Sequence, residues 1–210
     1  MPRKFVKTAH LLFLCANLKQ PIMLNIAIFA SGSGSNAENI ISYFKDKNIC
    51  RIGVIISNKS DAYVHERAKR LGVRSVAFSK SEFDSSDKVL DFLKSEHIDF
   101  IVLAGFLLKV PNNIIEAFPD KIVNIHPALL PKFGGKGMYG DNVHKAVVQA
   151  GEPESGITIH YINENYDEGN IIFQAKCRVE KNDTYEDVAH KVHELEYKYF
   201  PEVIESVLRS

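Results

Sequence analysis

The sequence of 210 residues contains no tryptophan, few cysteines and no excess of charge of either sign. Its cysteines show no Cys-x-x-Cys spacing, which indicates reduced thiols rather than a disulfide framework or a metal site: Cys15, Cys50 and Cys177. Equal numbers of basic and acidic residues cancel, so no large basic field favours a nucleic acid as partner. No apolar run approaches the ~20 residues that a membrane helix requires. We therefore expect a cytoplasmic protein whose partners are neither nucleic acid nor membrane.

The hydrophobic content of 45% is sufficient for one well-packed domain, and the chain is too short for two comfortable ones. We expect this domain to span residues 23–210. Residues 1–22 differ, because basic residues precede an apolar patch at Leu11–Cys15 and superficially resemble a signal peptide. The patch is short and lacks a small-x-small cleavage site. We therefore interpret residues 1–22 as an N-terminal extension whose place in the native protein stays open.

Apolar runs typical of buried parallel strands alternate with segments of helical spacing. The expected strands are Leu24–Ala30, Arg51–Ser57, Ser75–Phe78, Ile98–Ala104, Lys121–Ile125, Gly156–Tyr161 and Ile171–Val179. The expected helices are Ala37–Lys47, Tyr63–Leu71, Asp87–Glu96, Asn142–Ala150 and a closing helix after Thr184, which Pro201 is expected to bend or split. This alternation predicts an α/β fold of three layers, with a doubly wound, mostly parallel, Rossmann-like sheet between helices.

A glycine-rich turn, Ser31–Asn36, follows the first strand and opens the first helix. Free backbone amides and the helix dipole at such a turn form an anion cradle, so Gly34, Ser35 and Asn36 are candidate phosphate ligands. The alternative is an ordinary turn in which Ser35 or Asn36 caps the helix. Ala37 stands where the dinucleotide fingerprint has its third glycine, and the pattern also admits alanine there. We favour a single phosphate over a dinucleotide.

The stretch Lys121–Pro131 holds the strongest candidate site. Asn124 and His126 are two residues apart at the end of a β-branched strand, so their side chains lie on the same face. An amide donor beside an imidazole suits the stabilisation of negative charge on an acyl oxygen. The alternative is a polar strand end whose side chains only satisfy the backbone of the turn at Pro127.

Three segments are expected to meet, because ligands in doubly wound sheets bind at the carboxyl ends of the strands. These segments are Gly32–Asn36, Gly105–Val110 and Asn124–His126. The loop Lys132–Gly140 has four glycines in nine residues, and we expect a mobile loop over or beside the site. A second phosphate loop is the alternative, although no strand leads into it.

Several segments resemble the 10-formyltetrahydrofolate-dependent formyltransferases, and within them the phosphoribosylglycinamide formyltransferases. The distinctive matches are Val102–Phe106, Asn124–Lys132 and Asp167–Gly169, and the supporting ones are Ala30–Asn36 and Ile56–Lys59. The resemblance covers the chain from about Met23 to its last residue. It implies transfer of a formyl group from 10-formyltetrahydrofolate to the amine of glycinamide ribonucleotide, in purine synthesis and without a metal.

The resemblance assigns the family's catalytic asparagine, histidine and aspartate to Asn124, His126 and Asp167. Amine attack on the formyl carbon builds an oxyanion, which Asn124 and a protonated His126 would stabilise. Asp167 would favour the charged imidazole and help to move a proton from the attacking ammonium towards the folate nitrogen. The alternative for Asp167 is a turn residue that precedes Gly169.

The resemblance also implies two binding regions. Gly34, Ser35 and Asn36 would hold the phosphate of the ribonucleotide and Glu196 its ribose, while His193 either lines this pocket or lies on the surface. An apolar slot with backbone donors and acceptors suits the folate heterocycle. Its expected walls are Leu107, Leu108, Lys109 and Val110 on one side and Asn163, Glu164, Asn165 and Tyr166 on the other. The remaining candidates, His144 and His160, show no metal-ligand spacing.

Two features depart from the family pattern. The loop Gly134–Gly140 is longer than the compact loop that follows the motif elsewhere, so its contacts with substrate stay open. Ser85 and Ser86 stand where some relatives carry a basic residue near the folate tail, and Lys88 is a weak substitute.

Other functions remain as alternatives. Methionyl-tRNA formyltransferase and formyltetrahydrofolate hydrolase share the same catalytic core. The first normally adds a C-terminal RNA-binding domain and the second an N-terminal regulatory domain. We expect neither here, because no residues follow the expected closing helix and residues 1–22 are too few to form a domain. A non-catalytic module that binds a phosphate ligand is an alternative of another class, and the intact trio argues against it. The sequence leaves both a monomer and a homodimer open.

Overall fold

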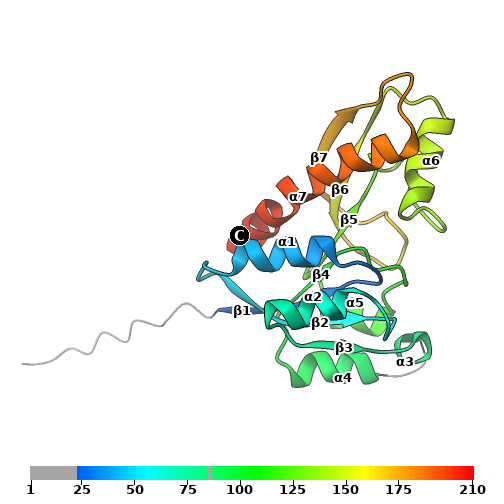
Figure 1. The fold of residues 1–210 in the computed structure, drawn as a ribbon. Helices are drawn as coiled ribbons and strands as arrows, with labels where there is room; N and C mark the ends of the chain where they lie inside the picture. Colours follow the sequence, from blue (N-terminus) through cyan, green and yellow to red (C-terminus); the bar gives the residue numbers. More distant parts are fainter. Residues whose placement is uncertain (1–22, 85–86) are drawn as a thin grey trace, which may run out of the picture.

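The computed structural model describes residues 23–84 and 87–210, so the interpretations of residues 1–22 and of 85–86 lie outside the described residues. A seven-stranded sheet of order β3-β2-β1-β4-β5-β6-β7 forms the centre (Figure 1). The strands are β1 Leu24–Phe29, β2 Cys50–Ser57, β3 Ser75–Ala77, β4 Phe100–Leu103, β5 Ile122–His126, β6 Glu154–Tyr161 and β7 Ile171–Arg178. Strands β1 to β5 pair in parallel, and β6 and β7 are antiparallel to their neighbours. The predicted mostly parallel sheet is confirmed.

Helices cover both faces of this sheet (Figure 1). They are α1 Ser35–Phe44, α2 Val64–Leu71, α3 Lys80–Asp84, α4 Lys88–Ser95, α5 Asn112–Ala117, α6 Asp141–Gln149 and α7 Tyr185–Arg209. Along β1, Ile26 and Ile28 join the buried cluster under α1 and α7, while Ala27 and Phe29 join the one under α4 and α5. This alternation arises because successive strand side chains point to opposite faces. The three predicted layers follow from these two clusters.

Strand β5 lies between a parallel neighbour, β4, and an antiparallel neighbour, β6. Val123 and Ile125 enter the cluster under α1 and α7, and Ile122 enters the opposite one. Asn124 and His126 therefore share the face of Ile122, as the spacing predicts. The register of the antiparallel pair sets Asn124 directly opposite a residue of β6, His160.

The short helices α3 and α5 have five and six residues, and the sequence analysis predicts neither. Each spans less than two turns, so no repeat of apolar residues can indicate it. Phe83 of α3 and Ile114 of α5 are buried and complete the cluster under α4. Over the described ranges, no helix is long and apolar enough to cross a membrane.

Helix α7 runs unbroken through Pro201, so of the predicted bend or split the split is wrong. The predicted cap is confirmed, because the Thr184 hydroxyl accepts a bond from the backbone N–H of Asp187. A proline at position 201 offers no N–H to the carbonyl of Tyr197, four residues earlier. Asn39 of α1 donates its side-chain N–H to that carbonyl at 2.8 Å. A hydrogen bond from the neighbouring helix therefore replaces the one that Pro201 removes.

We expect Asn39→Ala to lower the free energy of unfolding by roughly 1 kcal/mol, because it leaves the Tyr197 carbonyl without a protein donor. Urea unfolding measures this change. In a Pro201→Ala background the restored backbone N–H reaches the same carbonyl, so Asn39→Ala should cost less there. Equal costs in the two backgrounds would show that Asn39 and Pro201 are not coupled.

Candidate active site

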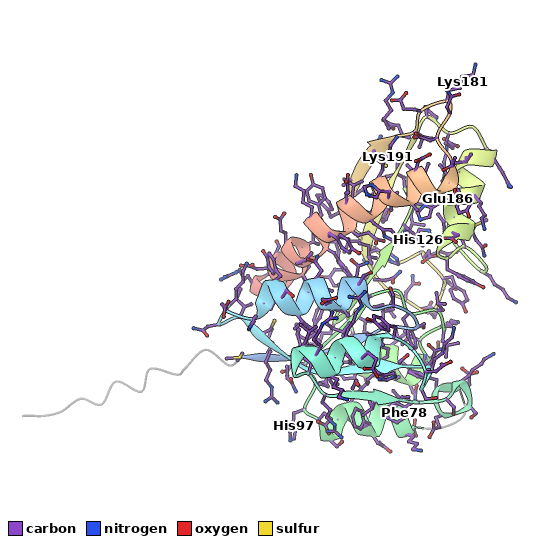
Figure 2. All side chains as sticks on the ribbon, viewed as in Figure 1. Phe78, His97, His126, Lys181, Glu186 and Lys191 are labelled. Atoms are coloured by element: carbon purple, nitrogen blue, oxygen red, sulfur yellow. The ribbon has the colours of Figure 1, made fainter. Side chains whose placement is uncertain are left out.

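A cavity of about 490 Å³ lies at the carboxyl ends of β1, β4 and β5. Its volume falls within the range of roughly 300–1,000 Å³ that small-molecule pockets occupy. The turn before α1, the segment after β4, the end of β5, the glycine-rich loop and the turn before β7 all line it. His126, at the end of β5, lies in this region (Figure 2). The three segments that the sequence predicted to meet do share one cavity.

The turn before α1 lines this cavity with Gly32–Asn36. Gly34 caps α1 with φ 74° and no side chain caps the helix, so the alternative in which Ser35 or Asn36 is the N-cap is wrong. Both residues lie in the first helical turn, whose amides have no partner four residues earlier. A Cβ at Gly34 would lie 2.3 Å from Cγ2 of Val64. The left-handed φ and this close approach of α2 both require glycine.

Asn124 has its side chain fixed by His160. The Nδ1 atom of His160 lies 2.8 Å from the backbone oxygen of Tyr161, so Nδ1 carries the hydrogen and Nε2 is an acceptor in the neutral ring. Asn124 Nδ2 donates to that Nε2 at 3.1 Å. Burial lowers the pKa of His160 and favours the neutral form that this bond needs. One N–H of the Asn124 amide is thereby used, and the second is left for a ligand.

Asp167 lies between two imidazole rings. His126 is only 3% exposed, and its Nε2 donates to the Phe133 backbone oxygen at 2.8 Å, which leaves Nδ1 for the carboxylate side. That Nδ1 lies 3.6 Å from Asp167 Oδ2, and His160 Nε2 lies 3.7 Å from Oδ1. Both distances are too long for a direct hydrogen bond. The backbone N–H of Gly135 donates to Oδ2 at 2.8 Å and holds the carboxylate in place.

The turn that carries Asp167 is tightly constrained. Asp167 has φ 56°, a conformation that aspartate and asparagine tolerate better than most residues. A Cβ at Gly169 would lie 1.8 Å from the backbone oxygen of Tyr161, so only glycine fits there. Asp167 is thus a turn residue, as its alternative interpretation holds, and its side chain also lines the cavity.

A second polar group lies where α1, α6 and α7 meet at the cavity. Glu196 is 5% exposed, and its Oε2 accepts from Asn36 Nδ2 at 2.9 Å and from His193 Nδ1 at 2.8 Å. The bond to Glu196 raises the pKa of His193. His193 lines the cavity with about half of its side chain exposed, so it combines the two positions expected for it.

The segment after β4 forms another wall, with Leu107, Leu108, Lys109 and Val110 in the cavity lining. The backbone N–H of Leu107 donates to the Ser31 hydroxyl at 2.8 Å. That hydroxyl donates in turn to Asn58 Oδ1 at 2.5 Å. Ser31 therefore joins the strand ends of β1 and β2 to this wall.

The turn before β7 forms the facing wall through Asn163, Asn165 and Tyr166. Glu164 was predicted with them, but it is exposed and does not line the cavity. Asn163 Oδ1 accepts from the backbone N–H of Asn165 at 2.9 Å, which closes a tight Asx turn around Glu164. The Lys109 ammonium lies 6.0 Å from the centre of the Tyr166 ring, so the two walls approach each other there.

The glycine-rich loop lies beside the cavity, as expected, and Gly135–Gly140 line it. The loop contacts two of the three candidate catalytic residues. The Phe133 carbonyl accepts a hydrogen bond from His126, and the Gly135 amide donates one to Asp167. Within residues 23–84 and 87–210, no group of His, Cys, Asp and Glu side chains is arranged to hold a metal ion.

No role was predicted for two histidines of the cavity, His144 and His160, because neither shows metal-ligand spacing in the sequence. The burial of His160 could have been predicted from the sequence. Side chains alternate along β6, so His160 lies on the same face of the sheet as Thr158, and both are buried. His144 of α6 is buried and lines the cavity, and its Nδ1 has no hydrogen-bond partner. No pattern around His144 distinguishes it from an ordinary core position.

Comparison with known families gives one match that spans most of the chain. The model of the formyl transferase family matches residues 24–204. Among curated proteins, a chloroplastic phosphoribosylglycinamide formyltransferase from Arabidopsis thaliana is 40% identical over 194 residues, which is 90% of this chain and 66% of that protein. The phosphoribosylglycinamide formyltransferase of Bacillus subtilis is 34% identical over 191 residues, which is 89% of this chain and 95% of that one.

Solved structures agree with these relatives. A crystal structure of glycinamide ribonucleotide transformylase 1 from Geobacillus kaustophilus has a TM-score of 0.81 and 33% identity, covering 89% of this chain and 99% of that chain. The chain spans 66% and 60% of the length of the two plant relatives, from Arabidopsis thaliana and Vigna unguiculata.

We expect the free energy of unfolding to decrease as the pH is lowered below about 6.5, the unperturbed pKa of histidine. Burial lowers the pKa of His144 and of His160, so the unfolded chain takes up protons that the folded protein does not. Each such proton contributes up to about 1.4 kcal/mol per pH unit, between the unfolded pKa and the lower folded one. His160→Gln keeps an acceptor for Asn124 but removes one titrating ring, so its unfolding free energy should depend less steeply on pH.

Urea unfolding of both proteins between about pH 7.5 and 5.5 measures the two slopes. His193 acts in the opposite sense, because its raised pKa gives stability below pH ~6.5 that is lost as the pH rises. This contribution is common to both proteins and cancels in the comparison. Equal slopes would contradict a neutral, buried His160.

Proposed function

This chain belongs to the formyl transferase family, and we propose that it transfers the formyl group of 10-formyltetrahydrofolate to the amine of glycinamide ribonucleotide in purine synthesis. One observation carries the proposal. A single cavity joins an amide-rich turn suited to a phosphate with an asparagine, a histidine and an aspartate suited to acyl transfer. The names of the relatives support formyl transfer to this acceptor.

The acceptor binds along one side of the cavity. Gly34, Ser35 and Asn36 hold its phosphate with the free amides at the N-terminus of α1, where the helix dipole favours an anion. Glu196 accepts from the ribose hydroxyls, and His193 fixes its carboxylate from the opposite side. This arrangement directs the amine of the acceptor towards Asp167.

The reaction begins when the acceptor amine attacks the formyl carbon, and the carbonyl electrons move to the oxygen. The free N–H of Asn124 donates to that oxyanion, and His126 in its protonated form stabilises the same charge. Asp167 accepts a proton from the new ammonium, directly or through water, and passes it to the departing folate nitrogen. The C–N bond to the folate then breaks, so the formyl group ends on the acceptor and the proton on tetrahydrofolate. His160 and the Gly135 amide keep Asn124 and Asp167 in position.

The folate occupies the slot between the two other walls. Leu107, Leu108, Lys109 and Val110 provide apolar surface and backbone groups for the flat heterocycle, and Asn163, Asn165 and Tyr166 face them. Glu164 is not part of this proposal, because it does not line the cavity.

The proposal treats residues 23–210 as one catalytic domain, since one sheet and one family match run through them. A cytoplasmic location belongs to the proposal, and it agrees with the thiols of Cys50 and Cys177, which are free within the part of the chain that the structure describes. The names of the plant relatives describe those proteins as chloroplastic.

We expect Asp167→Asn to lower kcat by a factor of roughly 10² or more, the usual scale for lost acid–base assistance. Asparagine adopts the positive φ of this position, so the turn should persist. Formyl transfer from 10-formyltetrahydrofolate to glycinamide ribonucleotide is the assay. Asp120→Asn is the matched control, because Asp120 has φ 54° and is exposed outside the cavity.

The same assay separates the alternatives. No turnover by the folded wild-type protein that still binds ligand would favour a binding module. Release of formate without a formylated acceptor would indicate a hydrolase. Equal kcat values for Asp167→Asn and wild type would remove Asp167 from the mechanism.

We expect Gly34→Ala to raise the KM for glycinamide ribonucleotide by about tenfold or more, through displacement of the amides that bind phosphate. The new Cβ would overlap Val64 and strain a residue at φ 74°. Gly72→Ala is the matched control, because Gly72 has φ 69° but no atom within 4 Å of an added Cβ. That control should lose roughly 1 kcal/mol of stability without a change in KM. A parallel rise in the KM for the folate would argue against a specific phosphate site.

A further inference from the structure

Arg67 lies on α2 and contacts the turn that holds the proposed phosphate site. Its Nε donates to the Ser33 backbone oxygen at 2.8 Å. Ser33 lines the cavity, whereas none of the eight residues of α2, all of them within the described ranges, does so. Arg67 can therefore act on a ligand in the cavity only through this turn or through its charge.

The bond from Arg67 sets the direction of one peptide group of the turn. A trans peptide is planar, and its C=O and N–H point in opposite directions. The Ser33 carbonyl points to Arg67, so the N–H of Gly34, which belongs to the same peptide, points away from α2. This N–H has no acceptor among the described residues, and Gly34 lines the cavity. The direction of a free amide at the cavity is thus set from α2.

The preceding peptide is held in the same way. Its Gly32 carbonyl accepts from the backbone N–H of Val64 at 3.2 Å. Val64 begins α2, so this N–H has no partner four residues earlier within its own helix. The N–H of Ser33 thus also points away from α2. Two successive N–H groups on one side of a turn form a concavity that suits an anion.

Two further contacts hold the Arg67 guanidinium in place. Its Nη1 pairs with Glu38 in the first turn of α1, and its central carbon lies 5.1 Å from the centre of the Tyr63 ring. A guanidinium offers several donors in a fixed plane, so one side chain reaches both the turn and α1. Arg70 pairs with the other oxygen of Glu38. In the described part of the chain, Arg67 bonds the turn and Arg70 does not.

We infer that Arg67 is a positioning residue for the acceptor, because it holds the Ser33 carbonyl against α2 and thereby turns the Gly34 amide to the phosphate of glycinamide ribonucleotide. The inference rests on the proposed function and adds to it a residue outside the cavity. Glycines on both sides of Ser33 leave this backbone freer than other residues would, so an external bond is needed to select one orientation of the peptide. An amide held in advance binds an anion at a lower entropic cost than one that the ligand must order.

Two nearly isosteric substitutions separate the hydrogen bond from the charge. Arg67→Met keeps an unbranched stem but has no donor, and Arg67→Gln places an amide nitrogen as many bonds from the backbone as the arginine Nε. Both remove the charge and the pairing with Glu38. We expect Arg67→Met to raise the KM for glycinamide ribonucleotide about tenfold and Arg67→Gln to restore most of the affinity. The kcat and the KM for 10-formyltetrahydrofolate should stay unchanged in both.

Arg70→Met is the matched control, because it removes a pairing with Glu38 and leaves the bond to the turn. The acceptor KM of this control should equal that of wild type. Equal rises for Arg67→Met and Arg67→Gln would show that Arg67 acts through its charge, and no rise in either would show that the turn keeps its conformation without Arg67. A purely structural role predicts that the KM values for both substrates change with the melting temperature across these variants. Each of these three results would overturn the inference.

Amide NMR observes the peptide itself, and inorganic phosphate is the probe. Phosphate should shift the Gly34 amide proton in wild type and in Arg67→Gln, whereas Arg67→Met should respond with a Kd about tenfold higher. An unchanged Gly34 amide in wild type, or equal responses in all three proteins, would overturn the inference. Absence of formyl transfer by wild type, with this pattern of responses intact, would overturn the proposed function alone and leave Arg67 as the positioning residue of a phosphate site.

Discussion

The antiparallel pairing of β6 with β5 is the constraint on which the candidate site depends. It sets His160 directly opposite Asn124, so a side-chain hydrogen bond extends the backbone ladder into the cavity. The chain then leaves β6 and returns through a tight turn that carries Asp167 between the two imidazoles. A slip of one residue in this register would turn Asn124 and His160 away from each other. The geometry of three functional groups therefore follows from one strand pair.

Charge at the cavity is controlled by burial and by neighbours that act on three histidines in different ways. Burial lowers the pKa values of His144 and His160 and so favours the neutral form of both rings. The Glu196 carboxylate raises the pKa of His193 in a more exposed place. The same residue type thus supplies a neutral acceptor to Asn124 and a charge-assisted contact to Glu196.

Much of this site could be predicted from the sequence, because its main parts lie in local patterns. The two-residue spacing of Asn124 and His126 sets both side chains on one face of a strand. The glycine-rich turn after a buried strand sets free amides at the start of a helix. Short-range geometry determines both. Glu164 shows a limit of prediction from sequence, because an Asx turn formed by its neighbours sets the direction of its side chain. His144 shows a second limit, because its place in the cavity lining depends on α6 and α7 meeting in the folded protein. The split predicted at Pro201 is wrong for the same reason, because the donor that compensates for the missing N–H comes from α1.

The hydrogen bond from Asn39 to the Tyr197 carbonyl also bears on when the cavity is completed during synthesis of the chain. Helix α7 follows all the strands of the sheet in the sequence, yet it covers the cluster under α1 and carries Glu196 into the cavity. Until the ribosome has released this segment, α1 exposes apolar surface and Asn36 lacks its carboxylate partner. Residues about 160 positions apart must then find each other, and such long-range contacts form late. A nascent chain that already has its sheet therefore still lacks the part of the cavity lining that α7 contributes, His193 and Glu196.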